Sequence, residues 1–389
     1  MNFERLTAYL NGLKESYGVP GVDVKVMRNH ETVYRHMCGS SSYDGKRAVS
    51  EHDLYDIYSM SKIATMTAVM QCVERGLVAL DDEVSKYLPE YAEMYYVPDF
   101  KFEWPPKPLT QADATEKATN PIRIWNLMSM TAGLGYDTAS ESIREVQEKT
   151  GGEGSTREFV RAIAKNPLLY NPNTHYLYSL AHDVLAGVVE VVSGMRFGEY
   201  MRKNIFDPLG MKEIWYQVPA EEKGRLAAQY ALDFMTGEMT EKEGNTYRLS
   251  KNYESGGAGV CTSVDEYSKL LDALACNGVG ATGARILSEA SVREMGTNRL
   301  SPEQILEFQQ GMRLGYGYGL GVRVLIDGRY SKSPVGEFGW DGAAGAYALI
   351  DPVNHISVYY GQQVLGMVKS YAEIHPAVRD LVYEGFAEG

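Results

Sequence analysis

A serine and a lysine stand three residues apart at the start of a predicted helix, in the stretch Ser59-Met60-Ser61-Lys62. Residues i and i+3 lie on one helix face, so the Lys62 amine would be next to the Ser59 hydroxyl. A serine becomes a nucleophile only beside a base, and a lysine serves as a base only when burial or nearby charge lowers its pKa. The apolar residues after Lys62 favour such burial. The alternative is an N-cap serine followed by a solvated lysine.

Signatures of other catalytic chemistries are missing from the sequence. There is no G-x-S-x-G nucleophile elbow, which disfavours an α/β-hydrolase. There is no HExxH motif, and the seven histidines are scattered, so we predict no metal site. The glycine clusters GYGYGLG and GWDGAAG lack the strand-then-helix context of a phosphate or dinucleotide loop, and we therefore predict no cofactor.

Composition narrows the class of protein and its partners. The chain has 389 residues and a net charge of -13, which argues against nucleic acid and anionic membranes as partners. No apolar run is long enough to span a bilayer, and the N-terminal residues form an amphipathic helical pattern where a signal peptide would need an apolar core. The four cysteines show no CxxC pairing. We expect a cytoplasmic protein with reduced thiols.

Periodic apolar patterns place the remaining elements. The N-terminal helix is followed by GVDVKVM and ETVYRHMCG, two strand-like runs separated by a hairpin turn. Helices are predicted over 59–75 and 179–193, and strand-like runs followed by a final helix occupy the last third of the chain. Residues 95–121 form an irregular, Pro-rich and aromatic excursion, which we interpret as packing or a subunit contact in preference to a cleft wall.

The order of these elements predicts an α/β fold in two parts. Strands at both ends with helices between them suggest a sheet built from both chain ends, into which a mostly helical domain is inserted. We assign residues 1–62 and 255–389 to the α/β sandwich domain and residues 63–254 to the inserted domain, with the active site in the cleft between them.

Five segments in a fixed order resemble the serine β-lactamase-like superfamily, which includes class C β-lactamases, D-Ala-D-Ala peptidases and family VIII carboxylesterases. The resemblance covers nearly the whole chain. The segments are Ser59-Met60-Ser61-Lys62 for the S-x-x-K motif; Leu127 to Leu134 for LLTHTSGL, with Met130 in place of His; Tyr178-Ser179-Leu180 for the second motif; Gly256-Gly257-Ala258-Gly259 for a glycine turn; and Phe338 to Gly342 for the third motif.

The resemblance implies a fold and a set of roles. It implies a central antiparallel sheet flanked by the N- and C-terminal helices. Ser59 would form a covalent acyl-enzyme, and Lys62 and Tyr178 would share the proton transfers. The resemblance leaves open which of these two residues activates the serine. The oxyanion hole would consist of the backbone N–H groups of Ser59 and Ala343.

Departures from the family pattern concern substrate binding. Leu180 replaces a side-chain amide, and Trp340 replaces the Lys or His that helps to hold a substrate carboxylate in β-lactamases and peptidases. Asp341, between Trp340 and Gly342, would repel a carboxylate by roughly 1 kcal/mol or more if shielded from water. Trp340 could instead be a packing residue, and Asp341 could bind a cationic amine.

The leading hypothesis is therefore a serine hydrolase of esterase type that acts on small neutral esters or amides. A D-amino-acid or D-Ala-D-Ala peptidase, a weak β-lactamase and an acyltransferase would share the same residues. A ligand-binding sensor module is the non-enzymatic alternative. The expected partner is a small acyl substrate, and the oligomeric state does not follow from the sequence.

Overall fold

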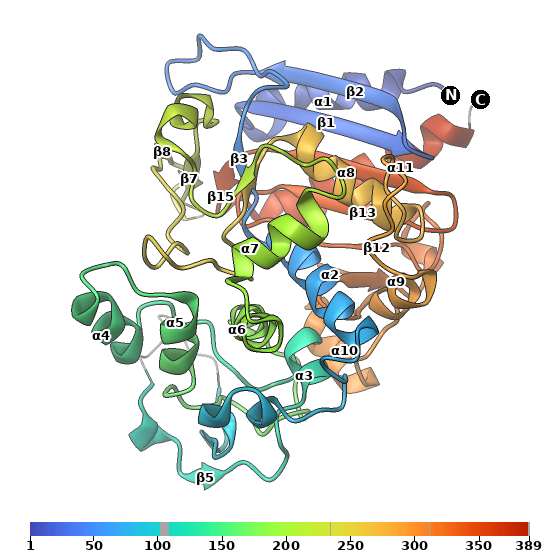
Figure 1. Cartoon of the computed structure of the whole chain (residues 1–389). Helices are drawn as coiled ribbons and strands as arrows, with labels where there is room; N and C mark the ends of the chain where they lie inside the picture. The colour runs from blue at the N-terminus through green and yellow to red at the C-terminus, as the bar shows by residue number, and fades with distance from the viewer. Residues whose placement is uncertain (102–108, 234, 311, 388–389) are drawn as a thin grey trace.

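The two ends of the chain meet in one seven-stranded antiparallel sheet (Figure 1), seen in a computed structural model that describes residues 1–101, 109–233, 235–310 and 312–387. The N-terminal hairpin joins the strands of the last third of the chain through β14, so the predicted sheet is confirmed. In spatial order the strands are β10 (Tyr316–Tyr318), β11 (Arg323–Leu325), β12 (Phe338–Gly339), β13 (Tyr347–Asp351), β14 (Ile356–Gly361), β1 (Gly21–Arg28) and β2 (Glu31–Gly39).

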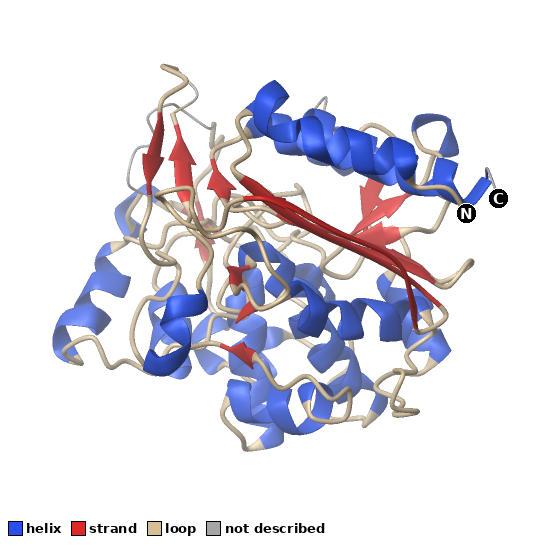
Figure 2. Ribbon diagram, turned by 90° about the horizontal axis from the view of Figure 1, so that it is seen from above, coloured by secondary structure: helices blue, strands red, loops and turns tan. Residues whose placement is uncertain are grey.

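Two terminal helices cover one face of this sheet, above the strands in Figure 2. Helix α1 (Glu4–Tyr17) buries Leu6, Leu10 and Leu13, which recur at helical spacing, and ends at Gly18 in the left-handed conformation. Helix α11 (His375–Ala387) packs beside it. Alternate valines of β1 face these two helices, as expected for a half-buried strand.

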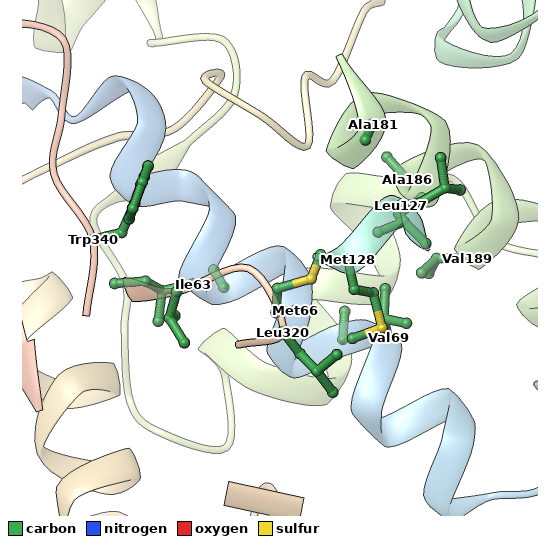
Figure 3. Close-up of a cluster of buried hydrophobic side chains, with 14 of the residues drawn as sticks. Ile63, Met66, Val69, Leu127, Met128, Ala181, Ala186, Val189, Leu320 and Trp340 are labelled. Carbon is green, nitrogen blue, oxygen red and sulfur yellow. The ribbon is translucent and has the colours of Figure 1, made fainter. Parts of the chain in front are cut away.

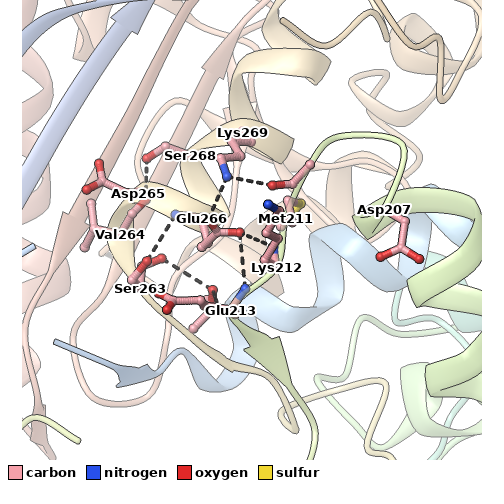
Figure 4. Close-up of polar contacts among 12 residues, drawn as sticks. Asp207, Met211, Lys212, Glu213, Ser263, Val264, Asp265, Glu266, Ser268 and Lys269 are labelled. Atoms are coloured by element: carbon pink, nitrogen blue, oxygen red, sulfur yellow. Dashed lines mark hydrogen bonds and ion pairs between the residues drawn. The ribbon is translucent and has the colours of Figure 1, made fainter. Parts of the chain in front are cut away.

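Helix α8 (Val264–Ala275) packs against the opposite face of the sheet. Ser263 caps it by accepting a hydrogen bond from the Glu266 backbone N–H at 3.2 Å (Figure 4). The Glu266 carboxylate accepts from the Lys212 N–H and from Lys269, which fixes the preceding chain to this helix. Farther along α8, Tyr267 donates a hydrogen bond to the Met60 carbonyl oxygen, so the helix supports the turn that carries Ser59.

Helix α2 (Ser61–Glu74) lies at the centre of the helical part of the molecule. It is buried around its whole circumference along most of its length. Figure 3 shows its side chains Ile63, Met66 and Val69 packed among residues of neighbouring helices. The other helices are α3 (Ile124–Met128), α4 (Glu141–Lys149), α5 (Thr156–Ile163), α6 (Ala181–Ser193), α7 (Phe197–Met201), α9 (Glu289–Met295) and α10 (Pro302–Gln309).

Short strands connect the helical part with the large sheet. One three-stranded sheet joins β3 (Tyr55–Asp56), β9 (Cys261–Thr262) and β6 (Ile214–Trp215), and another joins β15 (Val364–Leu365), β7 (Tyr230–Leu232) and β8 (Met239–Glu241). Strands within 63–254 therefore pair with strands outside this range. The proposed division into two domains stays a prediction.

The predicted excursion over 95–121 contains a two-stranded pair, β4 (Tyr95–Tyr96) with β5 (Glu116–Lys117), while residues 102–108 lie outside the described residues. All four cysteines are free thiols. Among the described helices, none combines the length and the apolar character needed to cross a bilayer.

Candidate active site

Ser59 lies in a strained turn at the N-terminus of α2. The turn is a 3₁₀-helix, Tyr58–Met60, and α2 begins only at Ser61, without a side-chain cap. Ser59 is therefore not the N-cap that the alternative interpretation required. Tyr58 has a φ of 46°, an uncommon conformation for a bulky side chain, and its buried hydroxyl donates to Gln229 at 2.8 Å. Such strain persists only where the surroundings enforce it, and it is concentrated at functional sites.

Lys62 is completely buried and its amine faces the Ser59 hydroxyl. The distance from Lys62 Nζ to Ser59 Oγ is 3.3 Å, and Nζ also donates to the Gly257 carbonyl oxygen at 2.8 Å. Burial lowers the pKa of Lys62 from 10.5 to about 7, although the Asp183 carboxylate acts in the opposite direction. A lysine with this pKa is partly a free amine at neutral pH, which is the form that can accept a proton.

Asp183, which the sequence analysis missed, organises the other side of Lys62. Its carboxylate is buried on α6 and accepts hydrogen bonds from the hydroxyls of Tyr253 and Ser255, both at 2.6 Å. A Cβ at Gly257 would lie 2.6 Å from an Asp183 oxygen and 3.3 Å from Lys62 Nζ. The glycine turn suggested by the resemblance is thus required by the close approach of backbone, carboxylate and amine.

Tyr178 joins the same cluster through its ring and its hydroxyl. The Lys62 amine lies 4.7 Å from the centre of the Tyr178 ring, and that ring stacks between Tyr136 and Trp340. Trp340 Nε1 donates to the Tyr178 hydroxyl oxygen at 3.1 Å. Burial raises the pKa of Tyr178, and hydrogen bonds with Ser59 and Trp340 offset only part of this effect. Tyr178 is therefore a neutral phenol near pH 7.

A second strained residue fixes the loop that carries Tyr178. Met130, which stands where the family pattern has His, is fully buried with a φ of 61°. Its carbonyl oxygen accepts from the Leu177 N–H at 2.9 Å, and its sulfur lies 3.5 Å from Ser179 Oγ. Met130 therefore holds the residues on both sides of Tyr178, by contacts that the sequence pattern did not indicate.

The predicted oxyanion-hole residue Ala343 lines the cavity beside Ser59. The Tyr371 hydroxyl donates to the carbonyl oxygens of Gly342 and Ala343, at 2.9 and 3.1 Å. Within the described part of the chain, the Ala343 N–H donates to no acceptor. Tyr371 thus satisfies these two carbonyl oxygens, and the Ala343 N–H is available for the predicted oxyanion hole.

These groups open into a cavity of about 420 Å³. Of the residues singled out from the sequence, Ser59, Tyr178, Trp340, Asp341 and Gly342 all line it. Its walls are rich in aromatic side chains, which also include Tyr136, Tyr176, Tyr247, Phe308 and Tyr371. None of the described residues of the 95–121 excursion is among them.

Two expectations about substrate binding are wrong. Leu180 does not line the cavity; it precedes α6, its N–H donates to the Gly135 carbonyl oxygen, and its side chain is buried in the apolar core. Asp341 does line the cavity but is not an unpaired charge, because Arg323 contacts one carboxylate oxygen at 2.8 Å and Arg313 contacts the other at 3.3 Å.

The pKa of Asp341 reflects this pairing. Burial acts to raise the pKa, but Arg323, His375 and Arg313 together outweigh it and hold the pKa below its ordinary value. The carboxylate is therefore ionised and its charge is compensated. Because Arg323 and Arg313 compensate the charge of Asp341, we no longer expect this residue to repel a substrate carboxylate or to bind a cationic amine.

Comparisons with known proteins identify the family of the chain. The Beta-lactamase family model matches residues 6–382. Esterase EstB from Burkholderia gladioli is 27% identical over 382 residues, which cover 91% of this chain and 88% of the relative.

Two solved structures have the same fold. The structure of "EstCE1, a hydrolase with promiscuous acyltransferase activity" superimposes with a TM-score of 0.77 at 22% identity and covers 98% of both chains. Unliganded simvastatin synthase LovD from Aspergillus terreus gives a TM-score of 0.80 at 20% identity, with 100% of both chains covered. With this α/β fold and a family match over nearly its whole length, the chain belongs to the Beta-lactamase family.

Proposed function

We propose that this protein is a serine esterase that cleaves small esters through a covalent acyl-enzyme on Ser59. One observation carries the proposal: the Lys62 amine, 3.3 Å from Ser59 Oγ, is buried so completely that its pKa falls to about 7. A lysine poised in this way has the property required of a general base at neutral pH. A solvated lysine would remain charged and could not accept the proton.

Acylation follows from this geometry. The free amine of Lys62 takes the proton of Ser59 as Oγ attacks the ester carbonyl carbon. The carbonyl oxygen becomes an oxyanion, which the N–H groups of Ser59 and Ala343 would stabilise. Because Tyr178 is a neutral phenol beside Ser59, it gives its proton to the departing alcohol, and the Lys62 ammonium returns a proton to Tyr178.

Deacylation repeats the proton transfers with water. The free amine of Lys62 takes one proton from the water molecule as its oxygen attacks the acyl carbon, and the Lys62 ammonium returns a proton to Ser59 Oγ as Oγ leaves. The acid product then dissociates. These steps leave Lys62 as the base of the acylation step and Tyr178 as the acid, the assignment that the sequence left open.

Two observations favour an ester over a peptide or a lactam. Aromatic walls suit an apolar ester, since they bury apolar surface at little entropic cost. The esterase name of the relative from Burkholderia gladioli gives independent support.

The test is an assay of the wild type and Ser59→Ala with p-nitrophenyl acetate, butyrate and octanoate, with nitrocefin alongside. We expect ester turnover that depends on Ser59, with nitrocefin nearly untouched. Adding a short-chain alcohol and analysing the products shows whether water or an alcohol accepts the acyl group. Failure of Ser59 to turn over any ester or to react with a fluorophosphonate would overturn the proposal and favour a sensor module.

A further inference from the structure

The cavity contains a cation that the sequence analysis did not identify. Arg313 lies between α10 and β10, lines the cavity, and exposes 23% of its side chain. Its guanidinium carbon lies 5.2 Å from the centre of the Trp340 ring and 5.6 Å from that of Phe308. Aromatic faces hold a guanidinium group in place while its N–H edge stays open to a further partner.

Most hydrogen-bonding capacity of Arg313 is unused. A guanidinium has five N–H donors, but among the described residues the Arg313 side chain donates only to Asp341, at a long 3.3 Å. That carboxylate already has the closer and more buried Arg323 as its partner, at 2.8 Å. Asp341 therefore orients Arg313 without neutralising it fully.

The other acid in the cavity wall does not satisfy Arg313 either. One oxygen of Glu307 lies 2.5 Å from His175 Nδ1, and the other accepts from the Tyr176 backbone N–H at 2.8 Å. Both oxygens are thus occupied. The guanidinium of Arg313 remains as a fixed, partly exposed positive charge in an aromatic cavity, which suits a planar carboxylate.

The position of Arg313 indicates which part of a substrate it meets. Trp340 contacts both the catalytic groups and the guanidinium: its Nε1 donates to the Tyr178 hydroxyl oxygen, and its ring lies against Arg313. In the proposed mechanism, Tyr178 gives a proton to the departing alcohol. The alcohol portion of the ester therefore faces Tyr178 and extends across Trp340 toward Arg313.

We propose that Arg313 selects esters whose alcohol portion carries a carboxylate. The inference rests on the proposed function and names its substrate class. It replaces the expectation of a strictly neutral substrate, which depended on an unpaired Asp341 and on the absence of any cation near the third motif.

Matched substrates test this proposal. The first pair is 3-acetoxybenzoate and its neutral methyl ester, which differ in the charge of the leaving group. The second pair is mono-p-nitrophenyl glutarate and p-nitrophenyl pentanoate, which differ in the charge of the acyl group. For each pair the measured quantity is the ratio of kcat/KM for the charged and the neutral ester, in the wild type, Arg313→Gln and Arg313→Lys. Arg329→Gln, at an exposed arginine, is the control.

We expect Arg313→Gln to lower the ratio for the acetoxybenzoate pair about 10- to 100-fold, mainly through KM, because a charge-assisted contact is lost. Arg313→Lys should recover part of the ratio, and Arg329→Gln should not change it. The glutarate pair should be unaffected. An unchanged acetoxybenzoate ratio in Arg313→Gln would overturn the proposal, as would an effect confined to the glutarate pair.

A binding measurement separates this inference from the proposed function. Calorimetry with 3-hydroxybenzoate and the Ser59→Ala protein requires no turnover. Binding weakened about 10-fold or more by a second change, Arg313→Gln, would support the carboxylate site even if no ester were cleaved. Equal binding with and without Arg313 would overturn it even if ester hydrolysis were established.

Discussion

Trp340 donates a hydrogen bond from its indole Nε1 to the hydroxyl oxygen of Tyr178, 3.1 Å away. In the family pattern this position holds a Lys or His, whose charge would favour the phenolate. A neutral N–H favours it less, and burial keeps the pKa of Tyr178 above its ordinary value. In the proposed mechanism Tyr178 is consequently the acid, and Lys62 is the base.

Replacing Tyr178 with Phe should therefore affect poor leaving groups most. Alkyl esters need protonation of the departing alkoxide, and we expect kcat/KM for them to fall about 10²- to 10⁴-fold. p-Nitrophenolate leaves without a proton. For p-nitrophenyl esters the rate constant of acylation, measured from the stopped-flow burst, should therefore fall much less. Tyr247→Phe is the matched control, because Tyr247 also lines the cavity and none of its side-chain hydrogen bonds is found among the described residues. Equal losses for both classes of ester would assign another role to Tyr178.

The pH dependence of ester hydrolysis should report the pKa of Lys62. Only the free amine accepts the Ser59 proton, and the pKa of Lys62 is about 7. We expect kcat/KM to level off above pH 7 and to fall tenfold for each pH unit below it. Lys62→Arg keeps the charge but stays protonated at every accessible pH, so activity should drop at least 10²-fold without recovery at high pH. A profile that is flat from pH 5 to 8 would contradict a lysine base.

Much of the architecture could be predicted because local patterns determine it. The leucines of α1 recur at helical spacing, and the valines of β1 alternate, so both elements and the faces they bury follow from periodicity. Ser59 could be singled out as the candidate nucleophile for a related reason: Ser59 and Lys62 are neighbours along the chain. The start of α2 was predicted two residues too early, because a 3₁₀ turn precedes Ser61 and cannot be distinguished from a helix by spacing.

The electrostatics of the site could not be predicted in the same way. Asp183 and Gly257 are 74 residues apart, and Asp341, which follows β12, is 18 residues from Arg323 on β11, so only the folded chain brings them together. An isolated Asp341 was expected to repel carboxylates, whereas its partners come from β11 and from the loop before β10. The substitution at Met130 was visible in the sequence but its strained conformation was not, because a positive φ at a methionine has no sequence signature.

Gly257 should tolerate no side chain. In Gly257→Ala the new Cβ would lie 2.6 Å from Asp183 and 3.3 Å from the Lys62 amine, so carboxylate and amine must both move. We expect a loss of about 1–3 kcal/mol in the free energy of unfolding together with a fall in kcat of at least tenfold. Urea denaturation and ester assays measure the two effects. Gly224→Ala is the control, since nothing lies within 4 Å of its Cβ position. Full activity in Gly257→Ala would show that Lys62 does not depend on this packing.

The buried Lys62 should also destabilise the fold, and in a pH-dependent manner. Its pKa is about 7 in the folded protein but 10.5 when solvated, so the unfolded chain binds more protons between these two values. The loss of stability caused by burying the charged lysine is complete below pH 7, where Lys62 is charged in both the folded and the unfolded protein. This loss decreases as the pH rises from 7 to 10.5.

Lys62→Met fills similar space without a charge. Its free energy of unfolding should therefore exceed that of the wild type by the largest amount at and below pH 7. Its advantage in the free energy of unfolding should shrink by about 2–3 kcal/mol between pH 7 and pH 9. The Gly257 carbonyl oxygen loses its lysine donor in this variant at every pH, so that cost cancels when the two pH values are compared. Urea denaturation at both pH values, with Ser59→Ala as the control that keeps the lysine, measures the difference. An advantage that stays constant with pH would mean that Lys62 keeps its ordinary pKa, and the base of the proposed mechanism would have to be sought elsewhere.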